Sequence, residues 1–183
     1  MTVNLSKLII VDVEATCWPK GEKPENESSE IIEIGICLFD ILNWRPMIKG
    51  QLVIQPVFST ISKYCTELTG LTTAAIHERG ILFSDACNTL ALVYDTKKYP
   101  WASWGDYDRT AFENDCRKKV VRYPFSGSHF NLKNIFAVHN KLSKGVGMRR
   151  ALELLEIPIE GNLHSGADDA WNIGRILEAQ GRW

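Results

Sequence analysis

The sequence predicts an α/β fold built on a mixed β-sheet, and two observations lead to that prediction. Apolar runs typical of strands dominate the first third of the chain. Segments with helical apolar spacing and capping residues dominate the remainder, and this order favours helices layered against a sheet. The 183 residues, 45% hydrophobic and 23% charged, predict a single domain over residues 1–183 with a sizeable core.

The first strand is predicted to lie in the middle of the sheet. Residues 8–11 are apolar on both alternating faces, so the strand should be covered on both sides. Asp12 and Glu14 then continue the face of Leu8 and Ile10, because residues two apart on a strand share a face.

The rest of the chain follows in a regular order. A polar loop over residues 18–29 should overhang the end of the first strand. Further strands are expected at residues 30–39, 47–54 and 99–104, the first two joined by a turn in an antiparallel meander. Helices are expected at residues 62–69, 72–79, 84–97 (with Ser84 as N-cap), 108–123, 131–142, 147–155 and 168–180.

The Asp12 and Glu14 pair indicates a metal site. Two like charges held side by side at the end of a buried strand repel each other and lose solvation. A divalent cation would remove that cost and use both groups as hard oxygen ligands. The alternative is that the strand has already ended and both acids are solvated. Glu33 is an isolated acid among apolar neighbours, placed either close to this site or at a solvent-facing edge position.

The segment His164–Asp169 is the most informative short pattern in the second half of the chain. Ser165 followed three residues later by Asp168 resembles a capping box, which gives Asp168 a structural role. His164 and Asp169 then occupy the two positions that flank a helix start, so both can face one site. The alternatives are an exposed loop histidine and a residue that interacts with the helix dipole.

A further carboxylate is expected between these two patterns. A predicted strand leads into a helix through Asp106 and Asp108, and either residue can be the N-cap of that helix. The pattern of residues alone does not choose between them.

The charge distribution and the cysteine content indicate which partners and which cellular location the protein can have. The net charge of −1 argues against a generally basic coat, but residues 117–150 hold nine Lys or Arg and no Asp or Glu. Such a stretch can follow a phosphate backbone, although it can equally be scattered over solvated helices. The five cysteines form no paired motif, and no apolar run is long enough for a membrane span, which predicts a reducing, cytoplasmic location.

Taken together, these residues resemble the D-E-D-D-h pattern of the DEDDh (DnaQ-like) 3′–5′ exonucleases. The order and spacing of four longer segments make the resemblance sharper. Residues 65–72 (CTELTGLT), 103–109 (SWGDYDR), 144–148 (KGVGM) and 164–173 (HSGADDAWNI) are similar to the enhanced-RNAi and histone-mRNA exonuclease subgroup, which includes bacterial KapD-like proteins.

The resemblance implies an RNase H-like five-stranded sheet, with three antiparallel strands followed by parallel strands and flanked by helices. It implies a metal-dependent 3′–5′ exonuclease acting on single-stranded nucleic acid, with RNA favoured over DNA. It selects Asp108 over Asp106, and it implies that His164 is the general base. Asp12, Glu14, Asp108 and Asp169 would hold two Mg²⁺ ions, which Mn²⁺ can replace, while Ala15, Thr16, Gly70 and Leu71 would hold the terminal nucleotide, Leu71 as a wedge beside the last base.

Two other functions stay open. One is a non-catalytic nucleic-acid-binding module of the same fold, which would be expected to have lost one of the five site residues. The other is a haloacid-dehalogenase-like phosphatase, which also begins with an apolar strand and two acids but leaves His164 and Asp169 without a role.

Overall fold

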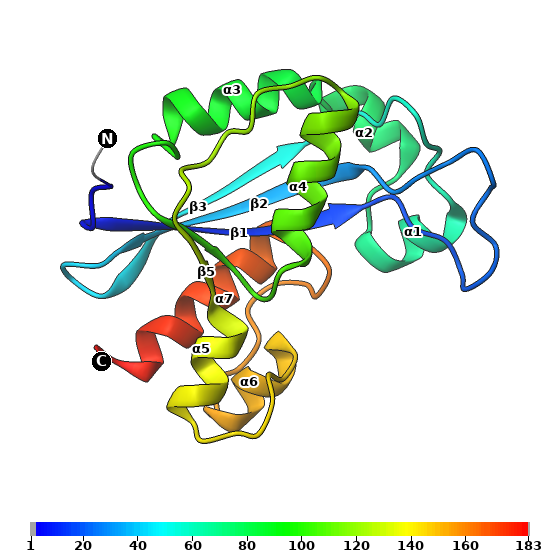
Figure 1. The fold of residues 1–183 in the computed structure, drawn as a ribbon. Coiled ribbons are helices and arrows are strands. Elements are labelled where there is room, and N and C mark those ends of the chain that lie inside the picture. The colour runs from blue at the N-terminus through cyan, green and yellow to red at the C-terminus, as the bar shows by residue number, and fades with distance from the viewer. Residues whose placement is uncertain (1–2, 183) are drawn as a thin grey trace.

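The computed structural model describes residues 3–182, so residues 1, 2 and 183 of the predicted domain lie outside the described residues. Its centre is a mixed sheet. The strands are β1 (Lys7–Ala15), β2 (Ile31–Asp40), β3 (Arg45–Val53), β4 (Trp101–Ser103) and β5 (His129–Asn131). They lie in the order β3-β2-β1-β4-β5 (Figure 1). The first three pair antiparallel, and β4 and β5 extend the sheet in parallel, which confirms the predicted topology.

Helices cover both faces of this sheet. Within the described residues they are α1 (Lys63–Thr69), α2 (Thr73–Arg79), α3 (Phe83–Val93), α4 (Tyr107–Lys118), α5 (Leu132–His139), α6 (Met148–Leu154) and α7 (Gly166–Gln180). In Figure 1, α3 and α4 lie over one face, and α5, α6 and α7 lie beneath the other. The helices α1 and α2 lie beyond the carboxyl end of β1.

β1 is buried on both faces, as its apolar sequence predicts. Ile9 and Val11 belong to a core cluster shared with α3 and α4, whereas Leu8 and Ile10 belong to a cluster shared with α7. The strand is therefore central, and its carboxyl end is held firmly from both sides of the sheet.

Several predicted helix boundaries were wrong by a few residues. α3 begins at Phe83 with Leu82 as its N-cap, so Ser84 does not cap it, and it ends at Val93. Asp95, with a φ of 53°, turns the chain away from the helix. In the same way α4 ends at Lys118, because Val120 adopts a φ of 55°.

The strand β5 was not located by sequence reasoning. It has only three residues, and the range predicted as a helix begins at its last residue, Asn131. Its identity as a strand comes from pairing with β4, where His129 lies opposite Trp101. Three residues are too few to show an alternating pattern, so only the neighbouring strand defines it.

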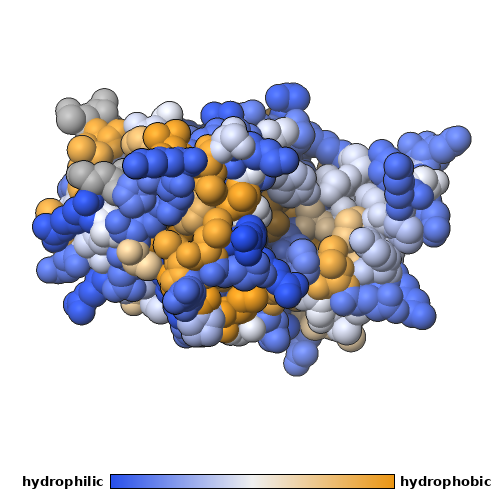
Figure 2. Space-filling model, turned by 90° about the horizontal axis from the view of Figure 1, so that it is seen from below, coloured by the Kyte–Doolittle hydropathy of each residue, from blue (hydrophilic) through white to orange (hydrophobic). Residues whose placement is uncertain are grey.

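Apolar side chains gather on the face seen from below in Figure 2. Phe130 of the edge strand β5 and Val138 of α5 are both exposed. A wholly apolar groove of about 230 Å³ is lined by Leu5, Leu8, Ile41, Trp44, Pro100, Phe130, Leu132, Ile135 and Leu177. None of the predicted site residues lines this groove, so it is not part of the candidate active site.

The five cysteines are free thiols in this structure. None of the helices in residues 3–182 combines the length and apolar character that a membrane crossing needs.

Candidate active site

The first two acids of the predicted site lie near the carboxyl end of β1. Asp12 and Glu14 leave the same face of the sheet, and both are half-buried. Their antiparallel partners on β2 are Gly35 and Glu33, respectively. Regular pairing is interrupted only after Glu14. Both carboxylates therefore stand on the strand itself, which contradicts the alternative that the strand ends before them.

The third acid comes from the first turn of α4. Asp108 is 5% exposed, and its Oδ1 accepts a hydrogen bond from the backbone N–H of Val13 at 3.0 Å. Val13 lies between the two acids of β1, so this bond places Asp108 directly beside them.

Asp106 has a different role. It is the exposed N-cap of α4, and its carboxylate accepts hydrogen bonds from Arg109 at 2.9 Å and from Asn131 at 2.7 Å. These contacts point it toward α4 and β5 rather than toward β1. The structure thus places Asp108, and not Asp106, with the acids of β1.

α7 and the residue before its N-cap supply the fourth acid and the histidine. The Oδ2 of Asp169 accepts the backbone N–H of His164 at 3.0 Å, and the N–H of Asp169 donates to the carbonyl of Ser165 at 2.8 Å. Side-chain ligand atoms of Glu14, His164 and Asp169 all lie within 4.8 Å of one another. The two distant motifs of the sequence therefore meet in one place.

The predicted capping box is not formed. Ser165 is the N-cap of α7, but its side chain makes no capping hydrogen bond. The carboxylate of Asp168 instead accepts the backbone N–H of Asn162 at 2.7 Å and pairs with Lys49 of β3. Lys49 lies 119 positions away from Asp168 in the sequence, so no local pattern indicates that the two residues pair.

Glu33 is a buried neighbour of the site, so of its two predicted placements the one close to the site is confirmed and the solvent-facing edge is excluded. It is 1% exposed, because β2 is an interior strand covered by α7. Its Oε1 accepts the N–H of Ala167 at 3.1 Å and the side-chain amide of Gln51 at 2.9 Å. Glu33 thereby ties the first turn of α7 to the strand beside Glu14.

Burial raises the pKa values of all four predicted ligands, and repulsion from neighbouring carboxylates raises the pKa of three of them further. Burial is the largest cause for Asp12, whose pKa lies well above its usual value, and the charge of Asp108 is the next. Burial and then the charge of Asp169 raise the pKa of Glu14 to about 8. Burial raises the pKa of both Asp108 and Asp169 to about 6, against the opposing effect of the backbone N–H groups that they accept. Such a cluster is unfavourable when every member is charged.

These residues fit a divalent cation. The Oδ1 of Asp169 is buried and has no hydrogen-bond partner among the described residues. A buried acceptor without a donor is rare unless an ion or water meets it. Carboxylate oxygens are the ligands that Mg²⁺ and Mn²⁺ prefer, and a cation among them would also relieve their repulsion.

The residues predicted to bind a terminal nucleotide come from two neighbouring segments. The carbonyl of Ala15, at the end of β1, lies 3.7 Å from the thiol of Cys65 in α1. Gly70 ends the same helix with a φ of 74°, in the left-handed region that favours glycine. The end of β1 and the T-G-L segment are thus adjacent, as one shared nucleotide site requires.

Thr16 and Leu71 are buried and make contacts within the protein. The backbone N–H of Thr16 donates to the backbone carbonyl of Glu30, and the carbonyl of Thr16 accepts a hydrogen bond from the hydroxyl of Ser29. Leu71 is 5% exposed and packs in a core cluster with Cys65. In this structure the Leu71 side chain is therefore part of the core and not an exposed wedge, which corrects the expectation.

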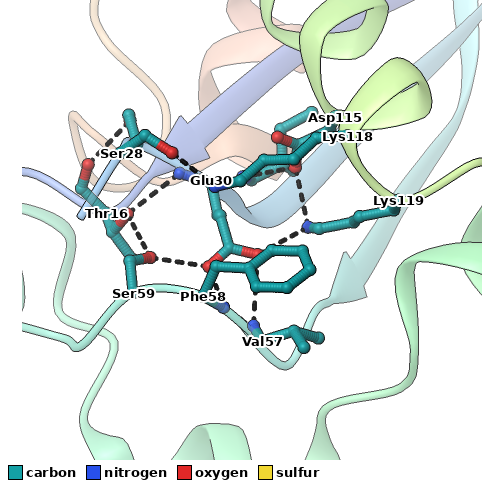
Figure 3. A network of polar contacts seen from close by, with 11 residues as sticks. Thr16, Ser28, Glu30, Val57, Phe58, Ser59, Asp115, Lys118 and Lys119 are labelled. Carbon is teal, nitrogen blue, oxygen red and sulfur yellow. Dashed lines mark hydrogen bonds and ion pairs between the residues drawn. The ribbon is translucent and has the colours of Figure 1, made fainter. Parts of the chain in front are cut away.

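A buried polar network supports the end of β1, and sequence reasoning did not find it (Figure 3). The Glu30 carboxylate accepts the backbone N–H groups of Val57 and Phe58 at 3.1 and 2.6 Å, and the hydroxyl of Ser59 at 2.8 Å. The Ser59 Oγ lies 2.9 Å from the Thr16 Oγ1. The segment after the first two acids is therefore held to β2 and to residues 57–59.

Lys119 completes this network from the end of α4. Its Nζ lies 2.9 Å from Glu30 and 2.8 Å from Asp115, and its side chain is 7% exposed. Asp115 also accepts the N–H of Ile31 at 3.0 Å. Lys119 therefore cannot contact a phosphate backbone, although it belongs to the stretch 117–150 that the sequence predicted could do so. The spacing of four between Asp115 and Lys119 was the one available signal.

Comparisons with known proteins agree with this arrangement. A family model described as Exonuclease (RNase_T) matches residues 9–177. ERI1 exoribonuclease 2 of Xenopus laevis is 28% identical over 92% of this chain, which spans only 27% of that relative. The 3′–5′ exonuclease Snipper of Drosophila melanogaster is 28% identical over 94% of this chain and 68% of its own length.

A solved structure supports the same fold. It shows a 3′-exonuclease in specific recognition of the 3′ end of a histone mRNA stem-loop, and it is 25% identical to this chain with a TM-score of 0.82. The alignment covers 96% of this chain and 63% of that one. These similarities favour the exonuclease prediction over the phosphatase alternative.

Proposed function

Because the chain belongs to the exonuclease family whose model matches it, we propose that it is a 3′–5′ exonuclease that releases nucleoside 5′-monophosphates from single-stranded RNA. The observation that carries this proposal is the convergence of Asp12, Glu14, Asp108, Asp169 and His164 at one end of β1. A binding module without catalysis would not need to keep all five groups together.

The four carboxylates would hold two Mg²⁺ ions, which Mn²⁺ can replace. When bound, divalent cations lower the pKa of a coordinated water and neutralise charge on the phosphate and on the leaving 3′-oxygen. The first two of these proposed ligands come from β1, the third from α4 and the fourth from α7, so three separate elements must be packed correctly for the site to exist.

His164 is the proposed general base. Its side chain is exposed at the edge of the site, while a ring nitrogen lies within 4.8 Å of carboxylate oxygens of Glu14 and Asp169. A neutral imidazole in this place can accept the proton of the attacking water. The water oxygen then bonds to the last phosphorus as the bond from phosphorus to the 3′-oxygen breaks. The departing 3′-oxygen takes a proton from solvent, so the shortened strand ends in a 3′-hydroxyl.

The end of β1 and the T-G-L segment would receive the terminal nucleotide. Of the four predicted residues, Gly70 is exposed whereas Ala15, Thr16 and Leu71 are buried, so Gly70 is the most accessible to a nucleotide. The names of the relatives support RNA as the preferred substrate. Recognition of the 2′-hydroxyl would provide that preference.

The test uses single-stranded RNA and DNA oligomers of one sequence, labelled at the 5′ end. We expect a ladder that shortens from the 3′ end in Mg²⁺, disappears with a chelator and forms faster on RNA. Lack of degradation in both Mg²⁺ and Mn²⁺ would reject the enzyme, and equilibrium binding of the same oligomers would then test the binding module. Release of inorganic phosphate from a small phosphate ester would instead favour the phosphatase.

A further inference from the structure

The loop that carries His164 is bound along one face of α7. Three polar side chains of that helix, Asp168, Asn172 and Arg175, follow at spacings of four and three residues. Such spacings place side chains on one face of a helix. All three reach the backbone of residues 158–162, the loop that precedes the helix in Figure 1.

Asn172 makes the central contact of this set. Its Oδ1 accepts the backbone N–H of Glu160 at 3.1 Å, and its Nδ2 donates to the carbonyl of the same residue at 2.9 Å. The side chain is 0% exposed. A buried amide that binds both backbone groups of one residue holds that residue in a single orientation, because any rotation leaves a buried polar group without a partner.

Arg175 and Asp168 extend the contact on either side. The Nη1 of Arg175 donates to the carbonyl of Pro158 at 2.7 Å and to the Oδ1 of Asn172 at 2.9 Å. Asp168 accepts the N–H of Asn162 at 2.7 Å, as described above. The loop is therefore held at three successive points, each two residues apart.

His164 lies two residues after Asn162, and its backbone N–H is held by Asp169. No hydrogen bond or ion pair with the described residues holds its ring, so the place of the ring beside Glu14 and Asp169 depends on where the loop backbone lies. That backbone has a φ of 62°, which a residue other than glycine seldom adopts. Such a conformation persists only where surrounding contacts determine it.

We propose that Asn172, assisted by Arg175, is a positioning residue for the general base. It fixes the loop over residues 158–164 so that the His164 ring stays beside Glu14 and Asp169. The inference rests on the proposed function for its catalytic consequence, but the restraint on the loop can be measured without any activity.

The experiment compares Asn172→Ala with Asn140→Ala in the full chain. Asn140 is a matched control, because its side-chain amide also donates to a backbone carbonyl, that of Phe136 at 2.9 Å, but at the end of α5. Hydrogen exchange followed by mass spectrometry should show faster exchange over residues 158–164 in Asn172→Ala and no change there in Asn140→Ala. Arg175→Gln removes a less buried contact and should increase exchange over residues 158–164 by a smaller amount. This variant tests the restraint even where Asn172→Ala fails to fold.

Single-turnover cleavage of RNA gives the second readout. Asn172→Ala should be slower by roughly 10- to 100-fold, as small misplacements of catalytic groups are. Its affinity for Mn²⁺ should stay unchanged in calorimetry. In a His164→Ala background the same substitution should cost no further rate, because a residue that acts through the histidine has nothing left to position.

Three results would overturn the proposal: unchanged exchange in the loop, a parallel loss of Mn²⁺ affinity, or an equal loss of rate in the presence and absence of His164. If the unsubstituted protein degrades no RNA, the proposed function fails. The exchange experiment would then still decide whether Asn172 restrains the loop.

Discussion

Gly35 of β2 and Gly166 of α7 lie backbone against backbone. A Cβ atom placed on Gly35 would be 1.8 Å from the carbonyl oxygen of Gly166, and one placed on Gly166 would be 3.1 Å from the carbonyl oxygen of Asp12. The absence of both side chains lets the first turn of α7 rest directly on the two strands. This close approach brings Asp169 beside the acids of β1.

Gly35→Ala should therefore dismantle the site. The atoms that the new methyl group would meet belong to backbone, so no side chain can rotate away and α7 must shift. We expect unfolding free energy to fall by about 3 kcal/mol or more, at the upper end of overpacking costs. Urea denaturation measures the loss, and Mn²⁺ calorimetry should show weakened binding.

Gly127→Ala is the control for this substitution, since a Cβ at Gly127 has nothing within 4 Å. It should be close to neutral in stability. Native-like stability and metal affinity in Gly35→Ala would show that α7 does not need this contact.

His164→Ala should lose most turnover while it keeps metal binding. The histidine is exposed, so its removal leaves the fold intact. General base catalysis typically contributes about 10²- to 10⁴-fold, and kcat should drop by that order. The measurement is kcat on a labelled RNA beside Mn²⁺ titration. His77→Ala, outside the site, serves as the control, and an undiminished kcat in His164→Ala would refute the base assignment.

Asp108 and Asp106 should respond oppositely to substitution. Asp108→Ala and Asp12→Ala are each expected to abolish both Mn²⁺ uptake and cleavage, because each removes a ligand from the cluster. Asp106→Ala should retain metal binding and most activity, since its partners are Arg109 and Asn131. Calorimetry distinguishes the two, and normal Mn²⁺ uptake by Asp12→Ala would remove it from the ligand set.

Stability should depend on pH through Glu30. Burial alone would raise its pKa, but the Lys119 ammonium and the N–H and hydroxyl donors around it outweigh burial, and the pKa is lowered from the usual 4.5. A lowered pKa in the folded state means that the stabilisation is complete above about pH 4.5 and is lost as pH falls through the folded pKa.

Glu30→Gln should accordingly destabilise the protein by about 3 kcal/mol at pH 7, as the loss of one partner of a buried ion pair does. The difference from the unsubstituted protein should shrink below pH 4.5. Denaturation curves from pH 3 to 8 check this, with Glu22→Gln in the exposed loop as control. A difference that stays constant with pH would mean that the Glu30 charge is not what stabilises the network.

Cleavage of RNA should weaken as salt rises, because contacts between cations of the protein and phosphates upstream of the 3′ end release counterions. We expect kcat/KM on an oligomer to fall with salt more steeply than on a p-nitrophenyl ester of a single nucleotide, which has no upstream phosphates. Lys144→Ala, at an exposed position, should reduce that slope. Equal salt dependence of the two substrates would exclude a role for upstream phosphates.

Local pattern was sufficient for the parts of the site that lie within one element. The apolar alternation of β1 predicted a central strand with Asp12 and Glu14 on one face, and the structure has both. Spacing around the start of α7 likewise predicted that His164 and Asp169 flank one site. Periods of two and 3.6 residues are properties of a single strand or helix, so they can be read without knowing the neighbours.

Only the tertiary structure decided the roles of residues that depend on contacts with other strands and helices. The residues alone left Asp106 and Asp108 as equals, and packing of α4 on β1 turned Asp108 toward Val13. The sequence left Glu33 either near the site or at a solvent-facing edge, and it placed Lys119 in a basic stretch. In the structure α7 covers Glu33, and Glu30 binds Lys119. Contacts between distant residues arise from how elements pack, and no local periodicity records that packing.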